Sequence, residues 1–351
     1  MRYTTLQAGR FVAAIAVLVY HVACHGRDIL GFESILTRPV STYYFRTSVI
    51  FFFALSGFVL AHGIQSASLR RFLSSRLLRL FPSYWLAVAL VWFVREMAVR
   101  PLPCDFKSVI YALTLYPAGP GSAAYALGIE WTLVYELFLS LALIPFAAMS
   151  RRWGLGLGTT IWLAVIFGKT IANSGTMFLP FPKSTEISFS VANVAFLLGV
   201  LGYLLHKTLA KIRLVLPVIV IVAMWLGAEF ASTHAGWSMW CQSLGTMAAV
   251  SFIATGKQLD AKNPFVKAGD WSYGIYLMHV PVMTAIFVLS SEYYGVSNSL
   301  AVLILGGITA CVVSATYGEI EWRVYRRLRA MGHRKVSVLP LSTPIEIRLA
   351  A

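Results

Sequence analysis

The chain has 351 residues, of which 58% are apolar and only 12% are charged. Soluble domains carry about 25% charged residues, so this composition excludes a soluble protein and indicates a membrane protein with several spanning segments. The formal net charge of +15 could suggest a nucleic-acid partner. However, the basic residues lie between apolar runs, where the positive-inside rule accounts for them, so we expect membrane lipids and no nucleic acid as partners.

Apolar runs long enough to cross a bilayer recur along the chain and predict an all-α fold, a polytopic transmembrane helix bundle of about ten spans. The runs cover residues 7–26, 43–64, 79–99, 130–149, 154–172, 188–206, 213–230, 237–255, 272–290 and 299–319. If both termini are cytoplasmic, 21 of the 29 Lys and Arg residues fall on the cytoplasmic side, in agreement with the positive-inside rule. We therefore expect an integral-membrane domain at residues 1–325 and a basic, disordered cytoplasmic tail at residues 326–351.

The first span holds Arg10 and His21, eleven residues apart. At about 100° per residue this separation is within roughly 20° of three full turns, so both side chains lie on one helix face, about 16 Å apart along the axis. An imidazole that deep in a bilayer is costly and by default marks a functional site. The alternative is a histidine that is satisfied by a neighbouring helix and has only a structural role.

The second span contains Ser56 and Gly57, a pair that favours close helix packing over a nucleophilic serine. The third span begins with Arg76 and Arg79, which are three residues apart and therefore share a face. Arg10 enters its helix at a similar depth, so three guanidinium groups could clamp phosphates at one membrane edge. The alternative is that they determine topology and contact anionic lipid headgroups.

The fourth span contains Glu136 and the ninth contains His279, at depths similar to that of His21. These three residues could converge on a polar cavity, where a carboxylate beside a histidine would orient it and raise its basicity, as in general-base sites. The alternative is a structural Glu–His pair between helices. Glu130 is rotated about 120° from Glu136 and sits at the membrane boundary, so we expect it to be solvated.

Three further residues are candidates for substrate binding. Trp131, at the start of the fourth span, is either an anchor in the aromatic belt or a platform on which a sugar stacks. Tyr276 lies three residues before His279 on one helix face, so both could line the same cavity. The four cysteines lack the spacing of a metal site, and no metal is expected. A cation cluster on the inner side of the membrane and a base on the outer side suit an enzyme whose donor has an anionic head in the cytoplasm and a reactive tail in the membrane. The same arrangement suits a proton-coupled transporter equally well.

Five short motifs follow one another from the first span to the ninth. They are Arg10 with His21, Phe52-Phe53-Ala54-Leu55-Ser56-Gly57-Phe58, Arg76-x-x-Arg79-x-x-Pro82-x-Tyr84-Trp85, Trp131-Thr-Leu-x-x-Glu136, and Ser272-Tyr-x-x-Tyr276-Leu-x-His279. In order and spacing the chain resembles the bacterial membrane acyltransferase-3 family, which O-acylates cell-surface carbohydrates, and it looks most like the exopolysaccharide-production branch. It departs from the family at Ile50, where an Asp is common, and in lacking an acidic residue just before Arg10.

The resemblance implies an O-acyltransferase in the bacterial cytoplasmic (inner) membrane. Its donor would be cytoplasmic acetyl-CoA or another short acyl-CoA, and its acceptor a hydroxyl of a lipid-linked or exported saccharide. The resemblance assigns catalysis to His21, as a general base or a transient acyl carrier, with Glu136 orienting it or stabilising its charge. Arg10, Arg76 and Arg79 would hold the CoA phosphates.

Two other function classes fit the same residues. A secondary transporter or flippase for a saccharide or organic anion is the main alternative, although the internal repeat typical of many transporters is not visible in the sequence. A scaffold without catalytic activity in a polysaccharide assembly complex is the other. It predicts that a His21→Ala substitution is tolerated.

Overall fold

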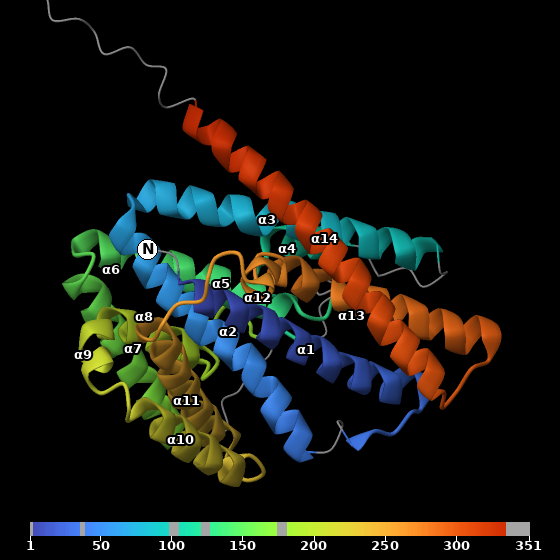
Figure 1. Cartoon of the computed structure of the whole chain (residues 1–351), viewed down its shortest axis with the longest axis horizontal. Coiled ribbons are helices and arrows are strands. Elements are labelled where there is room, and N and C mark those ends of the chain that lie inside the picture. Colours follow the sequence, from blue (N-terminus) through green and yellow to red (C-terminus); the bar gives the residue numbers. More distant parts are fainter. Residues whose placement is uncertain (1–2, 36–38, 98–104, 121–126, 174–180, 335–351) are drawn as a thin grey trace, which may run out of the picture.

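The structure, a computed structural model, describes residues 3–35, 39–97, 105–120, 127–173 and 181–334 as a bundle of α-helices (Figure 1). The helices are α1 (Thr4–Leu30), α2 (Pro39–Ser66), α3 (Leu69–Met97), α4 (Phe106–Thr114), α5 (Glu130–Ala142), α6 (Ile144–Met149), α7 (Trp153–Ala172), α8 (Asn193–Leu204), α9 (His206–Lys211), α10 (Leu216–Phe230), α11 (Ala235–Thr255), α12 (Pro264–Ala268), α13 (Ser272–Val288) and α14 (Leu300–Arg334), with a 3-10 turn at Ile187–Phe189 and a π-helical turn at Leu289–Tyr293. The predicted all-α class is confirmed for these residues, which contain no strand and a single isolated bridge, Ala118 to Lys183.

Seven of the described helical segments are long and apolar enough to cross a membrane. They are Thr4–Leu30, Phe45–Ser66, Leu69–Phe93, Glu130–Met149, Trp153–Ala172, Ser272–Tyr293 and Leu300–Ala330. The three other predicted runs correspond to α8, α10 and α11, of which α8 and α10 have 12 and 15 residues. A spanning helix needs about 20 residues. The structure thus supports a helical membrane bundle, whereas the count of ten and the cytoplasmic termini stay predictions.

The end of the chain differs from the expected tail. Helix α14 continues to Arg334, so residues 326–334 are helical rather than disordered. Figure 1 shows α14 crossing α3 and then extending past it. The apolar run ends at residue 319 because hydropathy detects the lipid-facing part of a helix, whereas the helix itself continues through a basic segment. Residues 335–351 of the predicted tail lie outside the described residues.

Helix α2 occupies the interior of the bundle and packs on α1, α8 and α11. Its contact with α8 depends on two glycines. A Cβ on Gly57 would collide with the carbonyl oxygen of Phe196, and a Cβ on Gly199 would collide with the carbonyl oxygen of Ala54. Small residues let transmembrane backbones approach this closely. The predicted packing role of Gly57 is therefore confirmed.

We expect Gly199→Ala to destabilise the protein by about 1–3 kcal/mol, because the added methyl group must push α8 away from the backbone of α2. The matched control is Gly168→Ala on α7, where a Cβ meets no atom within 4 Å. Thermal unfolding of both variants in detergent measures the difference. Equal stability of the two variants would contradict a close α2–α8 contact.

Helix α3 is held in place by tyrosines from two other helices. The Tyr273 hydroxyl of α13 donates to the carbonyl oxygen of Leu80 at 2.9 Å, and the Tyr317 hydroxyl of α14 donates to that of Ser83 at 2.7 Å. Pro82 lies between these carbonyls inside α3 and has no N–H group to contribute to the helix. The two bonds fix the segment of α3 that carries Arg76 and Arg79.

Candidate active site

The three predicted arginines line one cavity, which we call the arginine cavity. Arg10 comes from α1, and Arg76 and Arg79 come from α3. The remaining walls are formed by α2, α5 and α13 through residues that include Phe52, Phe53, Ser56, Thr132, Glu136, Tyr273 and Tyr276. The cavity has a volume of about 170 Å³. The predicted convergence of three guanidinium groups from two helices is therefore found in the structure.

The guanidinium groups have more donors than the protein satisfies. Within the described part of the chain, Nε of Arg10, Nε of Arg76 and Nη2 of Arg79 are buried and have no hydrogen-bond partner. Arg79 also packs over two rings of α14, 5.3 Å from the Trp322 centroid and 5.6 Å from that of Tyr325. Buried cationic donors without partners are costly unless an anion completes them. The cavity therefore has the chemistry of an anion site.

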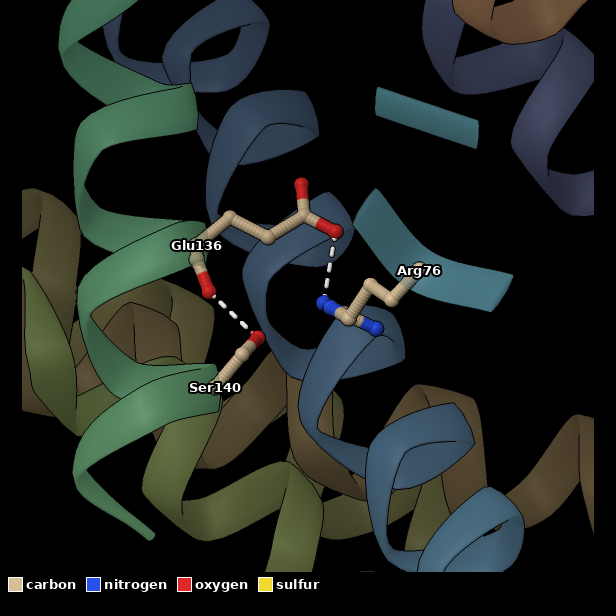
Figure 2. A network of polar contacts seen from close by, with 3 residues as sticks. All are labelled: Arg76, Glu136 and Ser140. Atoms are coloured by element: carbon tan, nitrogen blue, oxygen red, sulfur yellow. Dashed lines mark hydrogen bonds and ion pairs between the residues drawn. The ribbon is translucent and has the colours of Figure 1, made fainter. Parts of the chain in front are cut away.

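Glu136 forms an ion pair with Arg76, shown in Figure 2. Its Oε1 lies 2.6 Å from Arg76 Nη2, and the two side chains are only 29% and 15% exposed. Ser140, one turn further along α5, donates to the Glu136 carbonyl oxygen at 2.5 Å. The structure thus places this carboxylate against an arginine of the arginine cavity, and the expectation that Glu136 acts on His21 stays a prediction.

His21 lines a second cavity, the histidine cavity, with a volume of about 370 Å³. This volume is within the range of sites for small molecules. Trp131 lies in its wall, as a sugar platform requires, and so do Arg46 and Ile50. The apolar side chain of Ile50 thus lies in the same cavity wall as the candidate base.

The partner of His21 is His279. His21 Nδ1 lies 2.9 Å from His279 Nε2, and the ring centroids are 5.1 Å apart. His279 is completely buried, and its Nδ1 lies 2.9 Å from the carbonyl oxygen of Ile275. The predicted approach of His21 and His279 is found, with an imidazole in the place that was expected for a carboxylate.

The two cavities share part of their lining. Val49, Phe53 and Tyr276 belong to both, so the arginine cavity and the histidine cavity meet at these side chains. The hydroxyl oxygens of Thr132 and Tyr276 lie 2.7 Å apart, and the carbonyl oxygen of Ile129 lies 3.1 Å from the first and 3.5 Å from the second. Since α1 is one continuous helix, the eleven residues from Arg10 to His21 place these two residues about 16 Å apart along its axis.

Several residues of the site were missed or misplaced by the sequence interpretation. Glu130 is completely buried and its carboxylate accepts the Leu127 N–H, so the expectation that it is solvated is wrong. Thr132 and Tyr273 were not singled out, although the motifs contain both. Glu321 of α14 is buried and interacts electrostatically with Arg79. The sequence could have indicated Glu321, because it is an acidic residue just beyond the apolar run that ends at residue 319.

No three His, Cys, Asp or Glu side chains gather into a possible metal site among the residues that the structure describes. The expected absence of a metal stays a prediction. The described side chains form an anion site and an imidazole site in neighbouring cavities that share Tyr276 as a wall residue. Such an arrangement can hold an anionic donor at one end and remove a proton from an acceptor at the other.

Comparisons with known proteins identify the family. The acyltransferase-3 family model, described as an acyltransferase domain, matches residues 3–318. Nodulation protein 10 of Rhizobium leguminosarum bv. viciae is 26% identical over 285 residues, which is 69% of this chain and 72% of that protein. No solved structure matches the chain. Because the family model covers most of the chain, this multi-pass membrane protein belongs to the acyltransferase-3 family.

Proposed function

We propose that the protein is an O-acyltransferase that moves an acetyl or other short acyl group from cytoplasmic acyl-CoA to a hydroxyl of a lipid-linked or exported saccharide. The observation that supports this most is that the two cavities are neighbours, with Val49, Phe53 and Tyr276 in the walls of both. Three arginines at one end suit the phosphates of CoA. The extended arm of CoA then carries the thioester past Tyr276 toward His21. The expected location is the bacterial cytoplasmic membrane.

In the transfer step, His21 removes the proton of the acceptor hydroxyl while the hydroxyl oxygen attacks the thioester carbonyl carbon. The carbon–sulfur bond breaks, and the departing CoA thiolate takes up the proton that His21 removed, which returns the imidazole to its neutral form. The products are a saccharide ester and free CoA. Trp131 supports the sugar ring in the histidine cavity, and Glu136 acts on the donor side by holding Arg76.

A vesicle assay tests this function. Inside-out membrane vesicles that contain the protein and native saccharides receive acetyl-CoA labelled with carbon-14 in the acetyl group. We expect label in the saccharide fraction that hydroxylamine releases, as it does from esters, and none in vesicles without the protein. Propionyl-CoA and succinyl-CoA, tested in parallel, define the acyl group.

The alternatives give different results in the same vesicles. A transporter or flippase would move saccharide across the membrane without forming labelled esters, and movement would not depend on acyl-CoA. A scaffold would leave ester formation unchanged when His21 is replaced. The first result would contradict the acyltransferase proposal, and the second would remove His21 from the chemistry.

A further inference from the structure

The buried imidazole of His279 touches the candidate base and has no other assigned role. We propose that His279 is a positioning residue, which accepts a hydrogen bond from His21 Nδ1 and thereby leaves Nε2 of His21 unprotonated and free to act as the base. This inference rests on the proposed function, and it concerns how His21 is prepared for the reaction.

The position of the ring proton can be assigned first for His279. Its Nδ1 lies 2.9 Å from the carbonyl oxygen of Ile275, one helical turn earlier. A carbonyl oxygen can only accept, so Nδ1 of His279 carries the proton. The ring neighbours of His279, which are His21 and Tyr276, bring no negative charge that would stabilise a buried imidazolium. In the neutral ring, Nε2 of His279 is therefore an acceptor.

The same reasoning then fixes His21. Its Nδ1 lies 2.9 Å from the acceptor Nε2 of His279, so Nδ1 of His21 must be the donor. A neutral imidazole has one N–H group, which leaves the lone pair on Nε2 of His21. His21 itself lines the histidine cavity, where the acceptor hydroxyl is expected. The second imidazole thus selects the tautomer and ring orientation of the first.

His279 differs from a carboxylate in one respect. A carboxylate partner both orients a histidine and stabilises the imidazolium that forms. A neutral imidazole supplies only the orientation. We therefore expect substitution of His279 to lower kcat through misplacement of His21 and to leave the KM for acyl-CoA unchanged, because His279 is not in the lining of the arginine cavity and Arg10 lies about 16 Å from His21 along α1.

Two substitutions separate this role from simple packing. His279→Leu fills the space without an acceptor and should lower kcat about 10- to 100-fold. His279→Gln provides a side-chain oxygen that can accept from His21 Nδ1, and it should recover most of the lost kcat. The control is His25→Leu, which removes the imidazole whose centroid lies 6.2 Å from that of His21 and should have little effect. Equal loss of kcat in the Leu and Gln variants would overturn the inference.

A spectroscopic measurement does not depend on the variants folding. Solid-state NMR of nitrogen-15-histidine-labelled wild-type protein in lipid reports which ring nitrogen of His21 is protonated. The expected result is a proton on Nδ1, and a proton on Nε2 would overturn the inference. The proposed function fails separately, if vesicles that contain the wild-type protein form no labelled ester. If His21→Ala is inactive while His279→Leu keeps the wild-type kcat, only the present inference fails.

Discussion

The His21→Ala variant is expected to transfer acyl groups about 10²–10⁴-fold more slowly than the wild type, the contribution typical of a general base. The reason is local, because the imidazole is the candidate base in the wall of the histidine cavity and Ala leaves a methyl group in its place. The donor site should remain intact, since no arginine of that site is changed. The measurement is the rate of labelled ester formation in vesicles that contain equal amounts of the two proteins.

The control for this variant is His234→Ala. His234 is exposed at the start of α11 and contacts the Thr233 hydroxyl at 2.9 Å, so its loss should leave the rate unchanged. Binding of acetyl-CoA to His21→Ala should also match the wild type, which shows that the fold and the arginine cavity are intact. Ester formation at the wild-type rate in His21→Ala would remove His21 from the chemistry and favour the scaffold alternative.

The sequence predicts best those relations that a single helix determines. Arg10 and His21 share a face of α1 because helical geometry fixes their angle and their separation. The same is true of Arg76 and Arg79 on α3. In each pair the structure places both side chains at cavity walls, as the spacing predicts.

Relations between helices were harder to predict. Depth alone put Glu136, His21 and His279 in one group, but depth does not give the rotation of each helix about its axis. Helix α5 is rotated so that Glu136 faces Arg76 and Glu130 faces the backbone of Leu127. Similarly, a hydropathy window could not show that α14 continues beyond residue 319 and brings Trp322 against Arg79.

The Arg76→Gln variant tests whether the ion pair of Arg76 and Glu136 serves to bind the donor. We expect this variant to lower kcat/KM for acetyl-CoA about 10- to 100-fold, because charge-assisted hydrogen bonds contribute about 1.5–3 kcal/mol. S-acetylpantetheine has the same thioester arm but no phosphate, so its kcat/KM should be nearly the same for the variant and the wild type. The matched control is Arg323→Gln on α14, which removes an exposed arginine that pairs with Glu319 outside both cavities.

Removing Arg76 alone leaves the half-buried Glu136 carboxylate without its partner, which can unfold the protein. The double variant Arg76→Gln with Glu136→Gln removes both charges and should restore folding without restoring the preference for acetyl-CoA over S-acetylpantetheine. The single variant Glu136→Gln then shows whether the carboxylate acts at the donor site or at His21. If Glu136 acts through Arg76, this variant reacts normally with S-acetylpantetheine and poorly with acetyl-CoA. Equal losses with both donors would instead place Glu136 at the chemistry of His21, despite the ion pair.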